Sequence, residues 1–267
     1  MVNSFWKYFS APLLKPLIYR RGLLRLIQSQ CILCGDQITL KDTKSDTTTA
    51  DICQFCRTHL PWLNDHCLRC ALPLPRPITA TNHRPKLCGQ CQQKPPPWQR
   101  ATAAWIYQQP IASLVTQLKY QRQYTHGRAL AKLAAPIWAH STTTQSKLDW
   151  LMPTPLHWYR SLRRGFNQSL LITQYASQEL GIPIYHGIKR KKYTPSQQLL
   201  NAKKRRNNLQ GAFSITHPAL IKGRSIALID DVMTTGSTAH EITQTLLRAG
   251  AKDVYIWILA RTPDQYY

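Results

Sequence analysis

From residue 99 onward, short apolar runs alternate with segments in which apolar residues recur at helical spacing. Within 224–230, residues 226–229 form a continuous apolar run, as expected of a strand that is buried on both faces. The expected strands are 100–108, 148–155, 224–230 and 253–261. The expected helices are 110–120, 127–140, 167–181 and 238–250. Strands alternating with helices predict an α/β fold with a doubly wound parallel sheet, in which ligands bind beyond the carboxyl ends of the strands.

The strand predicted at 224–230 leads into the sequence "IDDVMTTGST", which places Asp230 and Asp231 side by side. A helix is expected to begin near Thr238, because Thr238 and Glu241 have the spacing of a capping box. The loop amides, its hydroxyl groups and the helix dipole together predict an anion site that suits a phosphate. The carboxylates would hold ribose hydroxyls and, directly or through water, Mg²⁺. The alternative is an ordinary strand, turn and helix whose carboxylates only cap neighbouring groups.

All eight cysteines lie in the first 91 residues and form four CxxC pairs. The pairs are separated by 18, 10 and 17 residues, and 15–20 residues is the usual distance between zinc knuckles. The sequence therefore predicts two consecutive zinc ribbons of four cysteines each, with interleaved pairing and a secreted disulfide framework as the alternatives. Four thiolates leave no open coordination position, so the zinc ions would be structural. The first predicted site is Cys31, Cys34, Cys53 and Cys56, and the second is Cys67, Cys70, Cys88 and Cys91.

The segment "QQKPPPWQR" at 92–100 contains three consecutive prolines and predicts a stiff linker between two domains. We therefore expect an N-terminal extension at 1–30 with helical character, a double zinc ribbon with its linker at 31–98, and the α/β domain at 99–267. No run reaches the roughly 18 apolar residues of a membrane span, and the first 30 residues do not resemble a signal peptide. A cytoplasmic location is the expectation. The extension would pack on the next domain as a helix, form a frayed extension, or touch a membrane surface as a basic amphipathic helix.

The chain has 35 Lys and Arg against 12 Asp and Glu, a formal net charge of +23. A charge of this size attracts polyanions, namely nucleic acid, an anionic membrane surface or phosphorylated small molecules. Between residues 160 and 206 the only acidic residue is Glu179, and Trp158, Tyr159, Phe166 and Tyr193 accompany the basic residues. This mixture predicts a surface that stacks bases while it follows phosphates, with a merely solvated basic face as the alternative. The candidate nucleic-acid-binding residues are Arg160, Arg163, Arg164, Lys191, Lys192, Lys203, Lys204, Arg205 and Arg206.

The motif "ALIDDVMTTGST" resembles the phosphoribosyl-pyrophosphate loop of type I phosphoribosyltransferases. Together with the CxxC pairs, "KPPPWQR", "QLKY", "PTPLHWYRSLRRGFNQS" and "KKRRNNLQGAF", it makes the chain similar to the ComF family, in its GntX-like branch, from Cys31 to Arg261. The resemblance implies that Asp230 and Asp231 face ribose hydroxyls. The implied 5′-phosphate contacts are Thr234, Thr235, Gly236, Ser237 and Thr238. The implied pyrophosphate-side loop includes Leu156, His157, Arg163, Arg164 and Gly165.

The resemblance also implies a cytoplasmic protein of DNA uptake in natural competence, or of the use of external DNA as a nutrient. One hypothesis is a module that binds single-stranded DNA and holds a phosphoribosyl ligand or a DNA 5′-phosphate at the loop. The other is an active phosphoribosyltransferase that uses Mg²⁺ and phosphoribosyl pyrophosphate, with Asp230 and Asp231 stabilising a cationic transition state. For the enzyme, His157 is the best acid/base candidate, although an ordinary surface histidine is an equal interpretation. A third hypothesis is a scaffold whose ribbons recruit another DNA-processing protein of the uptake pathway.

Overall fold

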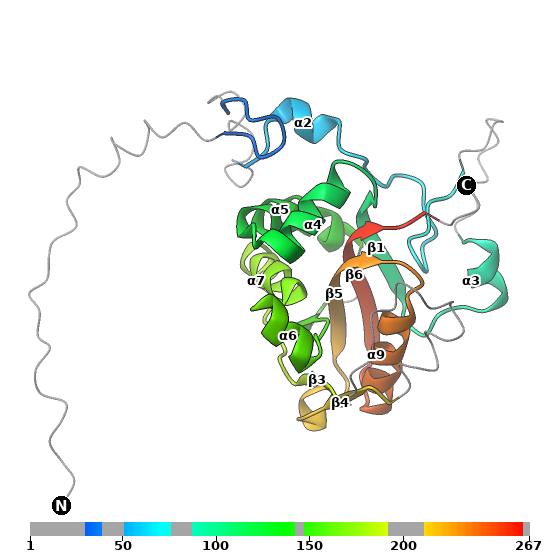
Figure 1. Cartoon of the computed structure of the whole chain (residues 1–267). Coiled ribbons are helices and arrows are strands. Elements are labelled where there is room, and N and C mark those ends of the chain that lie inside the picture. Colours follow the sequence, from blue (N-terminus) through cyan, green and yellow to red (C-terminus); the bar gives the residue numbers. More distant parts are fainter. Residues whose placement is uncertain (1–29, 39–50, 76–86, 142–146, 192–210, 264–267) are drawn as a thin grey trace, which may run out of the picture.

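The computed structural model describes residues 30–38, 51–75, 87–141, 147–191 and 211–263 (Figure 1). Most of the predicted N-terminal extension lies outside these residues. A four-stranded parallel sheet forms the centre of the molecule, with the strand order β1-β6-β5-β2. This sheet confirms the predicted α/β class. Its strands are β1 (Arg100–Ile106), β2 (Trp150–Pro153), β5 (Ser225–Met233) and β6 (Asp253–Arg261).

Helices cover both faces of the sheet, as a doubly wound fold requires (Figure 1). On one face, the helices α4 (Ile111–Gln121), α5 (Tyr124–Ser141) and α7 (Gln168–Leu180) pack against Ala227 and Ile229 of β5. The other face packs Ile226 and Leu228 against α9 (Ser237–Arg248). Successive side chains of a strand point to opposite faces, so burial on both sides explains why this stretch of sequence is continuously apolar.

Several local elements differ from the sequence-based expectation. The strand β5 continues to Met233, so the two aspartates lie within the strand and not at its last residue. Helix α9 begins at Ser237, and Glu241 accepts a hydrogen bond from the Gly211 N–H at 2.8 Å. The predicted capping box is therefore wrong, because Gly236 is the residue that precedes the helix. The elements that the periodicity missed are short, with too few residues to show a period. They are α2 (Gln54–Thr58), α3 (Gly89–Gln93), α6 (Trp158–Arg164), β3 (Ile188–Arg190), β4 (Phe213–Ile215) and the 3-10 turn η2 (Pro218–Leu220).

The chain between the two cysteine clusters runs along the free edge of β1. The Leu63 N–H donates to the Ala104 carbonyl, the Ile106 N–H donates to the Pro61 carbonyl, and both distances are 2.9 Å. Trp62 and Trp105 face each other across this antiparallel bridge, with ring centroids 5.2 Å apart. The pairing covers an edge that would otherwise expose backbone groups. The first cluster packs with the core on the α4 and α5 face, whereas Trp98, which bonds to the CLRC turn of the second, belongs to the core on the α9 face.

The first cysteine cluster packs on the α4 and α5 side of the domain. Cys31, Ile52 and Leu60 are buried in the same hydrophobic core as these helices. Arg128 of α5 forms an ion pair with Asp51, next to this core. Among the described residues, no helix combines the length and the hydrophobicity that crossing a bilayer requires.

Candidate functional site

The loop between β5 and α9 forms one wall of a pocket at the carboxyl end of the sheet. Gly236 has a left-handed backbone (φ 73°) and directly precedes the first helical residue, Ser237. The hydroxyl groups of Thr235 and Ser237 lie 2.8 Å apart. The first N–H groups of a helix have no partner within the helix, and with the helix dipole they favour an anion. The pocket is lined by Thr154, Leu228, Asp230, Val232, Met233, Thr234, Thr235, Gly236, Ser237, Thr238, Ala239, Ile256 and Ile258.

The sequence-predicted 5′-phosphate residues, 234–238, therefore all line a single pocket together with Asp230. Oδ1 of Asp230 accepts hydrogen bonds from the Ser169 hydroxyl at 2.8 Å and from the Asp231 N–H at 2.9 Å. Burial, followed by the neighbouring charge of Asp231, raises the pKa of Asp230 to about 6. This carboxylate is poised to exchange a proton or to accept a cation near neutral pH.

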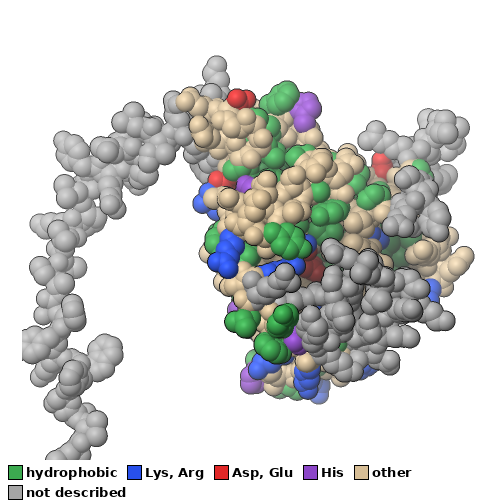
Figure 2. Space-filling view, viewed as in Figure 1, with side chains coloured by type: hydrophobic (Ala, Val, Ile, Leu, Met, Phe, Trp, Pro, Cys, Tyr) green, Lys and Arg blue, Asp and Glu red, His purple; other side chains and the backbone are tan. Residues whose placement is uncertain are grey.

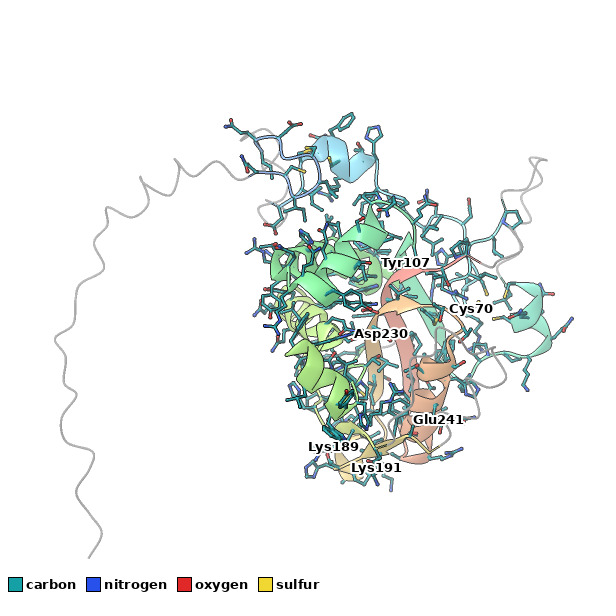
Figure 3. All side chains as sticks on the ribbon, in the orientation of Figure 1. Cys70, Tyr107, Lys189, Lys191, Asp230 and Glu241 are labelled. Atoms are coloured by element: carbon teal, nitrogen blue, oxygen red, sulfur yellow. The ribbon has the colours of Figure 1, made fainter. Side chains whose placement is uncertain are left out.

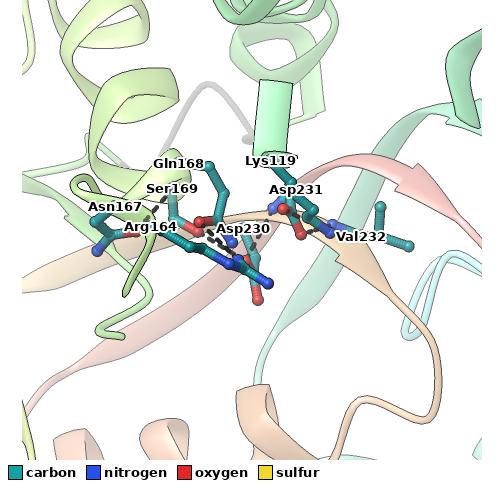
Figure 4. A network of polar contacts seen from close by, with 8 residues as sticks. All are labelled: Lys119, Arg164, Asn167, Gln168, Ser169, Asp230, Asp231 and Val232. Atoms are coloured by element: carbon teal, nitrogen blue, oxygen red, sulfur yellow. Dashed lines mark hydrogen bonds and ion pairs between the residues drawn. The ribbon is translucent and has the colours of Figure 1, made fainter. Parts of the chain in front are cut away.

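Asp231 has a different partner from its neighbour (Figure 4). Its Oδ2 lies 2.9 Å from Nζ of Lys119, and its Oδ1 accepts from the Val232 N–H at 2.6 Å. The side chains of Asp231 and Lys119 are only 6% and 19% exposed. Burial alone would lower the pKa of Lys119, but the Asp231 carboxylate outweighs it and the pKa of Lys119 is raised. Asp231 is thus committed to an internal ion pair, whereas Asp230 faces the pocket.

Lys119 and Ser169 were not predicted from the sequence as site residues. Lys119 belongs to the "QLKY" stretch, and it lies four residues after the buried Val115 and next to the buried Leu118. A lysine on the apolar side of a helix is the signal that would have identified it. For Ser169 the signal is Asn167, which caps α7 by accepting from the Ser169 N–H at 3.0 Å. The Asn167 side chain also donates to the Thr154 carbonyl at 3.1 Å, and these bonds hold Ser169 toward Asp230.

The predicted pyrophosphate-side segment is partly helical, because α6 occupies its middle. His157 is buried, and its Nδ1 accepts from the Tyr159 N–H at 3.3 Å, so it is not the surface histidine of the alternative interpretation. Arg164 donates to Gln168 Oε1 at 3.1 Å, and its guanidinium lies 5.4 Å from the ring centroid of Tyr120. Leu156 and Gly165 flank this helix, and Gly165 has a left-handed backbone (φ 79°). Arg163 belongs to α6, but its side chain lies outside the described residues.

The structure describes only part of the predicted nucleic-acid surface. Lys191 is exposed after β3, and Arg164 is partly exposed at the end of α6. Exposed aromatic rings lie on α6, where Trp158 and Tyr159 are 67% and 47% exposed, and on α4, where Tyr120 is 64% exposed. Figure 2 shows Lys and Arg side chains spread among hydrophobic ones on this side of the molecule. Lys192, Lys203, Lys204, Arg205 and Arg206 lie outside the described residues, as do the side chains of Arg160 and Arg163.

The eight cysteines form two groups of four, in the grouping that their spacing predicts. In each group the four sulfur atoms lie within 4.8 Å of one another. The Sγ–Sγ distance is 3.8 Å between Cys34 and Cys53 and 3.6 Å between Cys70 and Cys88, and all eight thiols are free. Tetrahedral zinc with bonds of about 2.3 Å places its sulfur ligands about 3.8 Å apart, so the donor set fits zinc. The hydrogen bond from the Cys70 thiol lowers the pKa of Cys67 to about 4.

Several known proteins are similar in sequence to this chain. It is 39% identical to DNA utilization protein YhgH of Escherichia coli O157:H7 over 214 residues, which cover 79% of this chain and 90% of the relative. It is 39% identical to Competence protein F of Haemophilus influenzae over 181 residues, which cover 65% of this chain and 78% of that protein. An amidophosphoribosyltransferase of Methanocaldococcus jannaschii is 28% identical over 82 residues, covering 31% of this chain and 17% of the enzyme. No protein-family model matches the chain.

Similar solved structures include a purine phosphoribosyltransferase of Pyrococcus horikoshii and the UMP synthase of Leishmania donovani. The first has a TM-score of 0.30 and 20% identity, covering 52% of this chain and 88% of that chain. The second has a TM-score of 0.33 and 20% identity, and the match covers 57% of this chain and 24% of the UMP synthase chain. The family assignment rests instead on the two relatives that share most of their length with this sequence. By that likeness, the chain belongs to the ComF family, with competence protein F and the DNA utilization proteins.

Proposed function

We propose that this protein serves DNA uptake or DNA utilisation in the cytoplasm, where it binds single-stranded DNA and holds a phosphoribosyl or phosphate ligand at the Thr234–Thr238 loop. The names of its relatives, DNA utilization protein and Competence protein F, support the biological role. The observation that supports the ligand site is that three kinds of group surround one pocket. They are the N-terminus of a helix, small hydroxylated side chains, and the Asp230 carboxylate, which accepts a hydrogen bond from Ser169. These groups recognise a phosphate together with a hydroxyl-bearing sugar or a hydrated cation.

The strand-binding part of the proposal is supported by exposed rings beside basic side chains. Tyr120 and Trp158 offer flat surfaces for base stacking, and the Arg164 guanidinium already lies over the Tyr120 ring. Stacking on aromatic side chains contributes about 1–3 kcal/mol per base and tolerates any sequence. The net charge of +23 supplies the phosphate attraction. The bound polymer is therefore expected to be single-stranded, because duplex bases are unavailable for stacking.

In the same proposal, each cysteine cluster binds one structural Zn²⁺ through four thiolates. The ligands of the first are Cys31, Cys34, Cys53 and Cys56, and those of the second are Cys67, Cys70, Cys88 and Cys91. When bound, each zinc ion would cross-link two CxxC turns that are distant in the sequence, and its binding free energy would add to the stability of the folded ribbon. The proposed domain division is that of the sequence analysis, with the ribbons and their linker at 31–98 and the α/β domain at 99–267.

Titration with phosphoribosyl pyrophosphate, with and without Mg²⁺, tests the ligand site. Isothermal titration should give a saturable, Mg²⁺-dependent signal for the wild type and a loss of affinity of about tenfold or more for Asp230→Ala. The matched control is Lys132→Gln, because Lys132 pairs with Glu179 at 3.5 Å and lies outside the pocket lining. Absence of binding to the wild type would refute the phosphoribosyl ligand.

A salt titration of single-strand affinity tests the polymer site. The logarithm of the association constant should fall linearly with the logarithm of salt concentration, with a slope near −0.7 for each phosphate neutralised. Replacing Tyr120 and Trp158 by Ala should weaken binding without changing the slope, because stacking involves no counterion. Weak binding that is insensitive to salt would refute this part of the proposal.

The second candidate is an active phosphoribosyltransferase that acts on a base or a nucleotide-like acceptor. The raised pKa of Asp230, next to the pocket, favours it, because a carboxylate there would stabilise positive charge that develops on a sugar. Release of pyrophosphate that requires both phosphoribosyl pyrophosphate and an acceptor would establish this activity. Strand binding that survives Asp230→Asn, without any pyrophosphate release by the wild type, would favour the binding module.

A further inference from the structure

We propose that the second cysteine cluster positions the phosphate loop, through Arg261 and Trp98, and that loading of this cluster with zinc and occupancy of the loop are energetically coupled. The inference deepens the proposed function, and only its ligand measurement depends on that function. The first cluster packs on the α4 and α5 side of the domain, and none of its described residues lines the pocket. It therefore provides an internal control.

Arg261, the last residue of β6, connects the cluster to the root of the loop (Cys70 and Asp230 are labelled in Figure 3). Its side chain is buried, and Nε donates to the Cys70 carbonyl at 3.0 Å. From the same guanidinium, Nη1 donates to the Met233 carbonyl at 3.1 Å, and to the carbonyl and hydroxyl oxygens of Thr262 at 2.7 and 3.1 Å. Met233 is the last residue of β5 and directly precedes the loop. One rigid, planar cation thus spans from a predicted metal ligand to the start of the loop.

Trp98 makes a second connection, independent of the first. Its indole N–H donates to the Arg69 carbonyl at 2.5 Å, and Arg69 Nη1 donates back to the carbonyls of Trp98 and Gln99 at 2.5 and 2.9 Å. Arg69 lies inside the CLRC turn and directly precedes Cys70. The Trp98 ring lies against Gly236, where an added Cβ would be 3.3 Å from ring atom Cη2. The indole is 4% exposed, so it supports the loop from the protein side.

Both connections depend on the conformation of the CLRC turn. The turn presents the carbonyls of Arg69 and Cys70, and it closes with the buried Ala71 in a left-handed conformation (φ 55°) that is unfavourable for a residue with a Cβ. The Ala71 N–H donates to the Cys67 carbonyl at 2.8 Å. Four metal–thiolate bonds would hold the turn in this shape, whereas four free thiols provide only weak hydrogen bonds. Loss of zinc from this cluster should therefore release both supports of the loop.

The first cluster has a different set of neighbours. Its described connections to the α/β domain include the Asp51–Arg128 ion pair, the apolar contacts of Ile52 and Leu60 with the α4 and α5 side, and the packing of Trp62 on Trp105. Asp51 and Arg128 do not line the pocket. Loosening the first cluster should thus leave the loop unchanged. By thermodynamic reciprocity, a ligand that orders the loop must stabilise the second cluster by the same factor.

Hydrogen exchange of the loop amides tests the coupling without any ligand. Full-length, zinc-loaded protein would be compared as wild type, Arg261→Met, Arg261→Lys and Arg128→Met, with exchange followed in peptides that cover 233–240. We expect exchange to rise about tenfold or more in Arg261→Met and to stay at the wild-type rate in Arg128→Met. Arg261→Lys should resemble Arg261→Met, because an ammonium group keeps the charge but cannot span both carbonyls. Wild-type exchange in either Arg261 variant would overturn the proposal.

Zinc release to a coloured chelator tests the reciprocal effect. With phosphoribosyl pyrophosphate and Mg²⁺ present, release of one of the two zinc ions should slow about tenfold in the wild type, and release of neither should slow in Arg261→Met. If the wild type binds no ligand but its loop exchange responds to Arg261, the proposed function fails and the positioning role stands. If ligand binds both proteins equally and exchange is unchanged, the positioning role fails and the proposed function stands. Should Arg261→Met not fold, Trp98→Leu breaks the second connection and decides the matter by the same exchange measurement.

Discussion

Replacing Asp230 by Asn should stabilise the protein at neutral pH, whereas the same change at the adjacent Asp231 should destabilise it. Asn keeps the size of the side chain and an oxygen that accepts from the Ser169 hydroxyl and the Asp231 N–H. At position 230 it removes a charge that burial and Asp231 disfavour. At position 231 it removes the partner of Lys119, a lysine that is only 19% exposed.

The magnitude follows from the pKa of Asp230, which rises from 3.8 to about 6. A pKa difference of about 2 corresponds to a free-energy cost of about 3 kcal/mol for ionising this carboxyl group in the folded state. Solvent in the pocket screens the charge, so we expect Asp230→Asn to raise the free energy of unfolding by about 1–2 kcal/mol at pH 7. The folded state holds the Asp230 proton more tightly than the unfolded state between about pH 4 and pH 6, so stability falls as pH rises through this window. Between pH 5 and pH 7 the free energy of unfolding of the wild type should fall by about 1 kcal/mol from this group, and Asp230→Asn should not show this fall. Asp231→Asn leaves a buried ammonium without its partner and should cost about 3 kcal/mol.

The assay is urea denaturation of the zinc-loaded protein between pH 5 and pH 8. Each variant is compared with the wild type in the same buffer, so that changes in zinc affinity with pH cancel in the difference. The difference between Asp230→Asn and the wild type should grow as pH rises. If Asp230→Asn is less stable than the wild type at pH 7, or keeps the full pH dependence, the folded state does not disfavour the ionised form of Asp230 and the reasoning is refuted. The opposite sign at position 231 serves as the control for simple loss of a carboxylate.

The remaining predictions concern metal, loop and ion pairs. Metal analysis should find two zinc ions per chain, and Cys70→Ser should retain only one; a single zinc in the wild type would disprove the grouping of ligands. Gly236→Ala should lower the free energy of unfolding by about 1–2 kcal/mol, because its φ is left-handed and the new Cβ meets Trp98, and thermal melting checks this. Lys119→Met should be destabilising at pH 7, but much less so when combined with Asp231→Asn, which a double-mutant cycle would measure. Arg128→Met should cost no more than about 1 kcal/mol, because Arg128 is 42% exposed, and a larger loss would mean that the first cluster depends on this pair.

The sequence predicted the sheet well because its elements are long and strongly patterned. The continuous apolar run before Asp230 indicated a strand covered on both faces, and the helices that followed had clear periodicity. The grouping of the cysteines was also predictable, since the spacing of CxxC pairs depends only on local turn geometry and on the size of the metal site. Elements of three to seven residues, such as α6 and β4, gave no periodic signal. Their positions depend on tertiary contacts that pattern alone does not contain.

The internal arrangement of the site was not predictable in the same way. "DD" suggested two equivalent carboxylates that face one ligand, but adjacent residues of a strand point in different directions, and only the fold brings Lys119 to Asp231. The role of Trp98 was hidden for a similar reason. Three prolines made its segment look like a linker, although its indole is buried against Gly236, which is far away in the sequence.

The different surroundings of the two aspartates also bear on whether the site binds or catalyses. A carboxylate that is fully neutralised inside the protein, as Asp231 is by Lys119, adds little attraction for a new cation. Burial and the neighbouring Asp231 charge make the ionised form of Asp230 unfavourable. Any ligand that brings positive charge, whether a hydrated Mg²⁺ or a cationic sugar, stabilises that ionised form. If the protein binds the ligand without reacting with it, Mg²⁺ and the phosphoribosyl group should lower the pKa of Asp230 in the bound state. If the protein is an enzyme, this stabilisation should be larger in the transition state than in the ground state, so Asp230→Asn would reduce turnover more than it reduces ligand affinity.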